Sequence, residues 1–401
     1  MILAFDLLSL GTHHGPANSA TLQTISYAVT DQAIRVHAHA SHIAELRGDP
    51  LLAGNHHIEF VDVAISPHYL EKSQVVSIRR FWREFVTLLR ALRPVPRSEY
   101  CLLVMLSTTS TLILAASLLA ATRWRRIGAL VCLHGNIADL TGWRSRNPVI
   151  RRLDLHAMLA RRHKLPLRYL VFEPSVRQEL GKLVPESLAY TDVLPHPANP
   201  AEITQQPSLT LQYPVRVGLV GQATEAKGVT AFLETARQFK QRHGGRVEFY
   251  LIGRVFPGDD ISRFAGLDGP VSTQQIARNT FRELLGRLHF VFLPLRPEYY
   301  RLAASGAVLD AITWLKPVIA TDIPIVAGIF ADFGDIGYLC STTEDMQHAL
   351  ESVLTSMDPT RYAEQVEAMR RAREARLPKS LAQDLRRMFA AHFRELIQRK
   401  A

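Results

Sequence analysis

The stretch that most constrains the fold lies in the middle of the chain and reads VRVGLVGQATEAKGVTAFLETARQF, from Val215 to Phe239. It opens with an apolar run, Val215 to Val220, which is typical of a fully buried strand. The run ends at Gly221, and an amphipathic helix is predicted after Lys227-Gly228, because apolar residues then recur at helical spacing. This order of strand, glycine turn and helix predicts one βα unit of an α/β domain.

The turn between this strand and this helix is a candidate phosphate site. Free backbone N–H groups and the helix dipole favour an anion at a helix N-terminus, and Lys227 adds a positive charge there. The alternative is an ordinary βα turn with a solvated lysine. The spacing excludes a Walker loop, which requires Gly-Lys-Ser/Thr, because Lys227 here precedes Gly228. It also excludes the three-glycine dinucleotide fingerprint, since only Gly218 and Gly221 are present.

The stretch resembles the start of the C-terminal domain in glycosyltransferases of the GT-B fold, in particular the bacterial group 1 enzymes of polysaccharide and lipopolysaccharide synthesis. In that family a strand ending in Gly-Arg is followed, five residues after the Arg, by Lys-Gly. Gly221, Lys227 and Gly228 match this pattern, and Gln222 stands at the Arg position. The resemblance implies that this turn holds the diphosphate of a sugar nucleotide and that Gln222 leaves one positive charge missing.

A second segment, Leu293 to Pro324, carries the same resemblance. In the family it holds the sugar nucleotide: a helix N-terminus receives the diphosphate, and a carboxylate one turn later receives the ribose hydroxyls. Ser305 and Gly306 take the first place here, and Asp310 takes the second, for which a helix-surface acid is the alternative. Arg254, which follows another predicted strand, completes the set of donor-binding candidates except for one acid.

That remaining acid departs from the family pattern. Many retaining members carry two Glu eight positions apart, but Leu302 stands eight positions before Asp310. Glu298, in the preceding loop, is our candidate for the same role. The donor sugar and the retaining or inverting outcome therefore stay open.

Two candidate catalytic residues are histidines that follow predicted strands in the first half. Ile2 to Leu8 is a predicted strand, and the glycine-rich loop after it carries His13 and His14. Ile127 to Leu133 is another predicted strand, and it ends at His134. Open α/β sheets bind ligands at the carboxyl ends of their strands. We therefore expect His134, or His13, to contact the sugar or to assist proton movement; a structural or solvated histidine is the alternative for each.

The order of predicted elements in the first half also resembles the acceptor domain of GT-B enzymes. At 401 residues the chain has the length of about two domains. We predict an α/β protein with two Rossmann-like domains facing a cleft, and a C-terminal helix that crosses back to the first domain. The predicted parts are an acceptor-binding domain at 1–198, a linker at 199–214, a nucleotide-sugar-binding domain at 215–378 and the terminal helix at 379–401.

Positive charge is concentrated in the first half. Between Arg79 and Arg168 there are 17 Lys and Arg against four Asp and Glu, an excess larger than the +10 of the whole chain. The predicted helix from Ser77 to Leu92 combines an apolar stripe with arginines, which indicates either a helix at an anionic membrane surface or a core-facing helix with a solvated basic side. Cys101 to Thr122 is uncharged and predicts a buried strand and helix, with a membrane span as the alternative.

Together these patterns predict a glycosyltransferase of the hexosyltransferase type that moves a sugar from a nucleotide-diphosphate sugar to a saccharide or lipid-linked saccharide, in cell-surface polysaccharide synthesis. A sugar-nucleotide epimerase or hydrolase and a catalytically silent scaffold are the alternatives. We expect no cofactor and no metal, since no Asp-x-Asp pair follows a strand. Nucleic acid is not an expected partner, because the sequence contains no nucleic-acid-binding motif. The three separated cysteines and the absence of a signal peptide predict a cytoplasmic protein, peripheral at the inner face of the plasma membrane.

Overall fold

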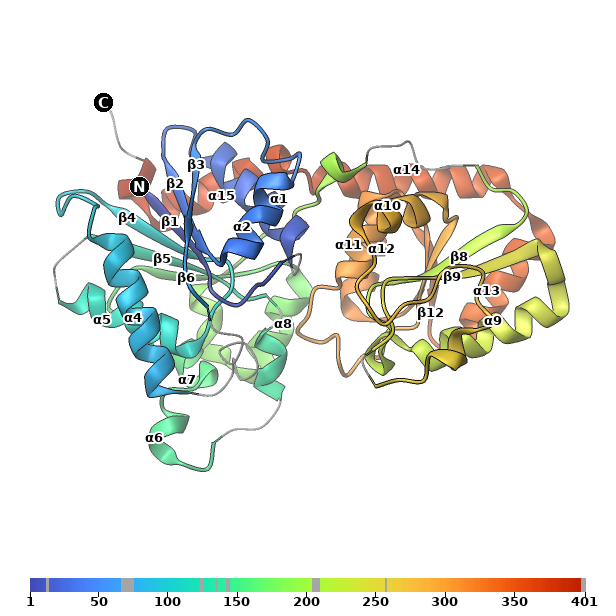
Figure 1. Cartoon of the computed structure of the whole chain (residues 1–401), viewed down its shortest axis with the longest axis horizontal. Helices are drawn as coiled ribbons and strands as arrows, with labels where there is room; N and C mark the ends of the chain where they lie inside the picture. Colours follow the sequence, from blue (N-terminus) through green and yellow to red (C-terminus); the bar gives the residue numbers. More distant parts are fainter. Residues whose placement is uncertain are drawn as a thin grey trace. The chain divides into compact units, whose positions relative to one another are not determined.

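The computed structural model describes residues 1–11, 14–65, 76–122, 126–134, 136–141, 145–203, 210–256 and 258–397. The chain forms two compact units (Figure 1). The N-terminal unit comprises Met1–Asn199, Leu302–Ala304 and Leu377–Ala401, and the C-terminal unit comprises Pro200–Arg301 and Ser305–Arg376. The chain thus leaves the N-terminal unit after Asn199 and ends within it.

The N-terminal unit is built on a parallel sheet of seven strands in the order β3-β2-β1-β4-β5-β6-β7. The strands are β1 (Ile2–Asp6), β2 (Ile34–Ala38), β3 (Ile58–Asp62), β4 (Cys101–Met105), β5 (Ile127–Cys132), β6 (Leu167–Val171) and β7 (Thr191–Val193). Strands β1, β4 and β5 are buried along their whole length. Helices cover both faces of such a sheet, which is why these strands are continuous apolar runs.

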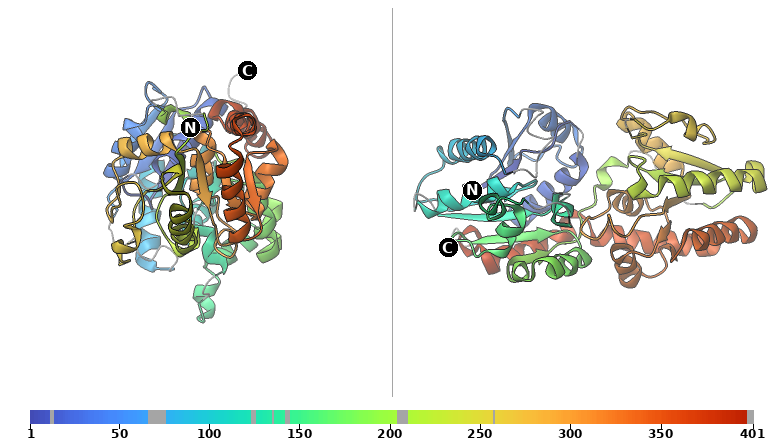
Figure 2. Two further views of the ribbon diagram at one scale, coloured as in Figure 1. Left: turned by 90° about the vertical axis from the view of Figure 1, so that its right-hand side faces the viewer. Right: turned by 90° about the horizontal axis from the view of Figure 1, so that it is seen from below.

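Two apolar cores lie on the opposite faces of this sheet. The first face is covered by α4 (Ile78–Leu92), α5 (Ser110–Ala121), α7 (Leu155–Ala160) and α8 (Pro174–Leu183). The second is covered by α1 (Gly15–Ala28), α2 (Ala40–Gly48), α15 (Pro378–His392) and α16 (Arg394–Ile397). Successive residues of β4 alternate between the cores, with Leu103 in the first and Leu102 in the second. The unit is therefore a three-layer α/β/α structure, of which Figure 2 gives two further views.

The C-terminal helices belong to the N-terminal unit, as the sequence predicted. Helix α15 packs against α1, and Phe389, Phe393 and Leu396 are buried in the second core. These apolar side chains cover the same sheet face as α1, so the end of the chain completes a layer that the first half leaves unfinished.

The C-terminal unit contains a second parallel sheet, in the order β12-β11-β10-β8-β9. Its strands are β8 (Val215–Val220), β9 (Val247–Ile252), β10 (Phe290–Leu293), β11 (Val318–Thr321) and β12 (Gly337–Cys340). Its helices are α9 (Val229–His243), α10 (Arg278–Arg287), α11 (Gly306–Thr313), α12 (Pro324–Phe333), α13 (Thr343–Ser356) and α14 (Pro359–Ala375). The order reverses direction at β8 and β10, whose carboxyl ends open into the two segments that the sequence singled out. The predicted α/β class with two Rossmann-like domains is confirmed.

Some local predictions fail for identifiable reasons. The sequence predicts that Ser175 caps a helix from Val176 to Leu183, but α8 begins at Pro174, and Glu173 takes the extended cap position without a side-chain cap. It also predicts a helix from about Ala20, but α1 begins at Gly15, because small and polar residues of its first turns are buried as well. Strand β2 and helix α2 were not predicted, since their short polar-interrupted sequences carry little periodic signal.

Helix α4 has both a core face and an exposed apolar face. Leu88 and Leu92 are buried, whereas Ile78, Trp82 and Leu89 are 70%, 56% and 38% exposed. The exposed three lie at positions i, i+4 and i+11, which fall on one side of a helix. Cys101 to Thr122 forms β4 and α5, and among the described residues no helix is long and apolar enough to span a bilayer.

Candidate functional site

The turn after β8 is shaped by Gly221. Its φ of +92° is a conformation that favours glycine, and a Cβ at this position would collide with the ammonium group of Lys227. The Lys227 Nζ instead donates a hydrogen bond to the carbonyl of Val220, at 2.8 Å. The lysine is thus folded back over the end of its own strand, with its charge held at the carboxyl edge of the sheet.

Lys227 is held in a partly desolvated position next to an acid. Burial lowers its pKa to about 8, and the charge of Asp310 acts in the opposite direction. Desolvation disfavours the charged ammonium, and a carboxylate nearby favours it. Lys227 and Asp310, which lie in two different predicted motifs, therefore interact electrostatically in the folded protein.

Gly228 packs directly against the loop that follows β10. It begins α9 with φ +70°, and a Cβ there would collide with the carbonyl oxygen of Pro294. Two residues further along this loop, the amide of Arg296 donates to the carbonyl of Ala226 at 3.1 Å. No larger side chain fits at position 228, so the close approach of the two segments explains the glycine.

Ser305 and Gly306 open α11, as predicted. The hydroxyl of Ser305 accepts a hydrogen bond from the amide of Val308, at 3.4 Å, in an N-cap arrangement. Gly306 is exposed, and a Cβ there would meet nothing within 4 Å, so open space lies beside the first turn. Asp310 follows one turn later and is half-buried.

The two predicted helix N-termini lie at the same edge of the sheet. Strands β8 and β10 are parallel neighbours, with Phe290 opposite Val217 and Val291 opposite Gly218. Helix α9 follows the carboxyl end of β8, and α11 follows the carboxyl end of β10 through the loop that touches Gly228. The N-terminal ends of both helices thereby lie at one edge of the C-terminal unit, where the helix dipoles favour an anion, although the amides of Gly228 and Val229 already donate to the carbonyls of Glu225 and Thr224.

The remaining predicted donor-site residues are Gln222, Arg254 and Glu298. Gln222 and Arg254 are half-buried, and the backbone carbonyl of Arg254 accepts from the amide of Ala223 at 2.9 Å. Glu298 is exposed on the loop after β10. Sequence reasoning missed Arg296, whose guanidinium lies 3.6 Å from the Glu225 carboxylate. Its position in the polar loop directly after a predicted strand was the available signal.

The N-terminal unit brings histidines together at the carboxyl edge of its own sheet. His134 Nε2 lies 2.9 Å from His14 Nδ1, and the rings meet edge-on with centroids 4.4 Å apart. His196, which follows β7, is buried, and its ring centroid is 5.4 Å from that of His134. His13 lies outside the described residues. Of the paired histidines in this loop, the structure therefore puts His14 beside His134.

His14 is held in an unusual conformation. It precedes α1 with φ 57° and ψ 11°, in the left-handed region that non-glycine residues seldom occupy. Such a residue is kept in place by its surroundings, and its hydrogen bond with His134 is one such restraint.

A buried carboxylate organises the loop that leads to His14. Asp6 accepts hydrogen bonds from Ser107 Oγ at 2.6 Å, from Asn18 Nδ2 at 2.5 Å and from the Ser9 amide at 3.0 Å. His42 lies 3.5 Å from the same carboxylate. Asp6 is fully buried at the end of β1, so these partners replace the water that it loses. In the described part of the chain, no group of three or more His, Cys, Asp or Glu could hold a metal ion.

Comparisons with solved structures define the fold. A glycosyltransferase from Rickettsia africae ESF-5 matches with a TM-score of 0.67 and 12% identity, over 100% of this chain and 99% of that one. WaaG, a glycosyltransferase involved in lipopolysaccharide biosynthesis, matches with a TM-score of 0.62 and 14% identity, over 97% and 99%. Anabaena Alr3699/HepE in complex with UDP matches with a TM-score of 0.63 and 14% identity, over 97% and 99%. The chain has the GT-B fold.

The sequence itself matches a family in its second half. Residues 214–356 match the family model described as "Glycosyl transferases group 1". This range contains the turn at Lys227 and the helix start at Ser305, so the resemblance inferred from these residues is confirmed. No curated protein matches the chain by sequence.

Proposed function

We propose that the protein transfers a sugar from a nucleotide-diphosphate sugar to an acceptor. The observation that carries the proposal is the joining of two loops at one sheet edge, where Gly228 packs on Pro294 and the Lys227 charge faces Asp310. The match of residues 214–356 to group 1 glycosyl transferases supports it. So do structurally similar proteins that were solved with UDP or UDP-glucose.

In this proposal the diphosphate lies between the start of α9 and the start of α11. Lys227 and the N-terminal ends of α9 and α11 neutralise the charge that builds on the leaving diphosphate. Gly221 leaves room for the lysine, and Asp310 accepts the ribose hydroxyls through charge-assisted hydrogen bonds. Gln222, Arg254 and Glu298 complete the proposed donor site.

Arg296 supplies the positive charge that Gln222 lacks. The amide of Arg296 donates a hydrogen bond to the carbonyl of Ala226, the residue before Lys227. The side chain of Arg296 therefore extends from a loop that lies beside the proposed diphosphate site. We propose a metal-independent hexosyltransferase without a cofactor, because protein groups stabilise the leaving group.

The acceptor is a saccharide or lipid-linked saccharide of cell-surface polysaccharide synthesis. His134, with His14 as its hydrogen-bonded partner, contacts the sugar or assists proton movement. The exposed Ile78, Trp82 and Leu89 of α4, together with the helix's arginines, hold the enzyme at the anionic cytoplasmic surface of the membrane. WaaG, a structurally similar protein, acts in lipopolysaccharide biosynthesis.

Donor binding is tested by thermal shift with UDP, GDP and ADP and their sugars. We expect one nucleotide series to stabilise the wild type, and Lys227→Ala and Asp310→Ala to abolish most of that shift. Each lost charge-assisted hydrogen bond is worth about 1.5–3 kcal/mol. Lys379→Ala and Asp332→Ala, at exposed positions, are the matched controls and should keep the wild-type shift. Wild-type shifts in the two site variants would refute this donor site.

Product analysis with a labelled donor separates transfer from the other reactions. Labelled sugar should appear on a saccharide or lipid acceptor together with free nucleoside diphosphate. Release of free nucleotide and free sugar alone would identify a hydrolase, and a changed sugar nucleotide would identify an epimerase.

A further inference from the structure

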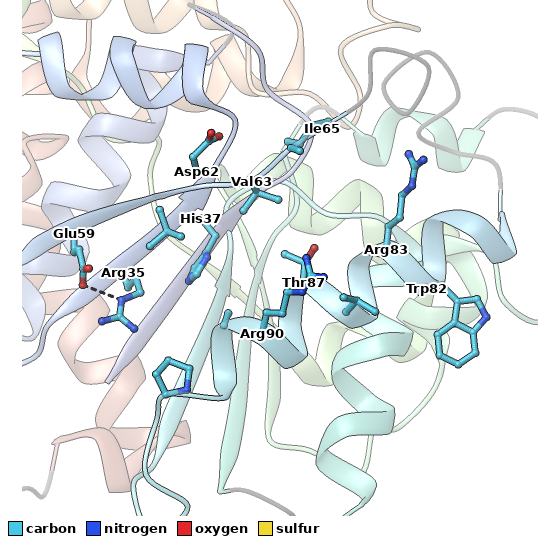
Figure 3. Close-up of a pocket in the computed structure, with 15 residues that line it drawn as sticks. Arg35, His37, Glu59, Asp62, Val63, Ile65, Trp82, Arg83, Thr87 and Arg90 are labelled. Carbon is cyan, nitrogen blue, oxygen red and sulfur yellow. Dashed lines mark hydrogen bonds and ion pairs between the residues drawn. The ribbon is translucent and has the colours of Figure 1, made fainter.

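A large cavity lies in the N-terminal unit, and neither His14 nor His134 lines it. It has a volume of about 1080 Å³ and lies between the outer strands β2 and β3 and helix α4 (Figure 3). This volume is slightly above the range of about 300–1,000 Å³ that is usual for small-molecule sites. The cavity is therefore large enough for an extended ligand.

The walls of the cavity are mainly apolar. Val61, Val63 and Ile65 line it from the edge of the sheet, and Val86 and Pro94 line it from α4 and the turn after it. The three strand-side residues are only half-buried, because Leu88 and Leu92 of α4 turn toward the core instead. An apolar strip of strand thus faces the cavity over the outer part of the sheet.

The floor of the cavity is polar but uncharged. His37 projects from β2 and stacks on Phe5 with ring centroids 5.0 Å apart; it is 5% exposed, and its Nε2 has no hydrogen-bond partner. Burial, and secondarily Arg35, lower the pKa of His37 to about 4, although Glu59 opposes the shift, so the ring is neutral at neutral pH. A buried polar atom without a hydrogen-bond partner is uncommon, and this one lies in the floor of the cavity.

Cations are available at the rim. Arg35 is already paired with Glu59 at 2.8 Å, but Arg83 and Arg90 form no ion pair with another described residue. Both are exposed, and Asp62, the remaining acid of the lining, points away from His37 and Thr87 (Figure 3). Arg83 and Arg90 can therefore pair with an anionic group on a ligand.

The cavity continues toward the carboxyl edge of the sheet. A smaller cavity shares Val63, Ala64, Ile65, Arg83 and Thr87 with it and adds Leu7, which directly follows β1, and the buried Glu84. The carboxyl ends of β1 and β5 lead to His14 and His134. The shared residues, Arg83 among them, therefore lie on the side of the large cavity that is nearer to the end of β1.

We propose that the cavity binds the hydrocarbon chain of a lipid-phosphate acceptor, with the phosphate paired to Arg83. A hydrocarbon chain suits the apolar part of the lining, formed by Val61, Val63, Ile65, Val86 and Pro94, against which the hydroxyl groups of a saccharide would lose hydrogen bonds to water. The aliphatic stem of Arg90 covers the chain while its guanidinium reaches solvent. This inference rests on the proposed glycosyl transfer and assigns its acceptor to a chemical class.

The test uses monododecyl phosphate, below its micelle concentration, as the probe and isothermal titration calorimetry on the full chain. Wild type should bind it saturably, whereas inorganic phosphate and maltotriose should not compete. Val86→Trp fills the cavity and should weaken binding by at least about tenfold, since it excludes several methylene groups. Val149→Trp, at an exposed valine of the short helix α6 (Pro148–Arg151), is the matched control and should bind as wild type.

Further variants separate chain from phosphate and protect against a folding defect. Arg83→Glu should weaken dodecyl phosphate but leave dodecanol binding unchanged, and Arg386→Glu, an exposed arginine of α15, is its control. If Val86→Trp fails to fold, Val63→Glu puts a charge in the cavity wall and should give the same loss. Absence of saturable binding, competition by maltotriose, or wild-type affinity in the folded cavity variants would overturn the proposal.

The outcome is distinguishable from that of the proposed function. The cavity variants should keep the nucleotide-dependent thermal shift of wild type, because every donor-site residue lies in the C-terminal unit. Absence of dodecyl phosphate binding alone would refute the proposed acceptor class. Absence of any nucleotide-dependent thermal shift in wild type would refute the transferase proposal.

Discussion

The carboxyl edges of the two sheets are formed by different chemical groups. In the C-terminal unit the edge is mostly backbone: Gly221 and Gly228 let two loops and a lysine come together where side chains would collide. In the N-terminal unit the edge is made of buried side chains, with Asp6 bonded to Ser107 and Asn18 and with His14 bonded to His134. Backbone N–H groups at a sheet edge can bind an anion without regard to the rest of the ligand. An edge formed by side chains can instead be specific for one partner.

The largest effect should come from the side-chain edge. Asp6→Ala leaves the hydroxyl of Ser107, the amide of Asn18 and two backbone N–H groups of the following loop without their acceptor. We expect a loss of about 3 kcal/mol or more in the free energy of unfolding, because buried donors stay unsatisfied. Denaturant unfolding measures this, with Asp31→Ala at an exposed site as control. Equal stability of the two variants would contradict a structural role for Asp6.

The backbone edge should be sensitive in a different way. Gly228→Ala puts a Cβ against the Pro294 carbonyl at a φ of +70°, so we expect a loss of about 1–3 kcal/mol and of the nucleotide-dependent shift. Gly328→Ala, in α12 with nothing within 4 Å of the new Cβ, should instead stabilise by up to about 1 kcal/mol. Thermal unfolding with and without nucleotide gives both readouts, and a neutral Gly228→Ala would remove the argument for close packing.

Helices α4 and α15, which cover opposite faces of the N-terminal sheet, should differ in how they meet a membrane. Reversing two exposed charges on and beside α4, Arg79→Glu with Arg93→Glu, should weaken co-sedimentation with anionic vesicles by about 2 kcal/mol, or roughly thirtyfold. The double variant Lys379→Glu with Arg386→Glu on α15 carries the same charge change and should bind nearly as wild type. Equal loss in both double variants would show an effect of net charge rather than of α4.

The smallest effect is the pH dependence of donor binding. The pKa of Lys227 is about 8 in the folded protein, below its ordinary 10.5, so the ammonium is lost as pH rises through 8. Nucleotide affinity should therefore fall about tenfold between pH 7 and 9. Folding stability should move the other way and rise between pH 8 and 10.5, because the unfolded chain keeps the proton longer. Lys227→Gln should abolish both trends, and a flat affinity profile in wild type would contradict the role of this charge.

Local patterns predicted the elements whose signals lie within a few residues. The strand at Val215 to Val220 and the Ser305 cap of α11 appear as expected, because an apolar run and a capping hydroxyl act on their immediate neighbours. The prediction that Ser175 caps α8 was wrong, and the reason is also local. Pro174 occupies the first helical position, so Ser175 already lies inside the helix. Arg296 was not singled out, because its nearness to Lys227 depends on packing between two loops.

The sequence alone determined the fold class, the two α/β units and the order of glycines and lysine in the turn after β8. These features follow from periodicity and from backbone conformations that few residues adopt. Only the tertiary structure decided that Asp6 is a buried hub, that His14 meets His134, and that Val61 and Val86 face one cavity. Each of these pairs residues far apart in the chain. Such contacts depend on strand order and helix packing, which no short stretch of sequence specifies.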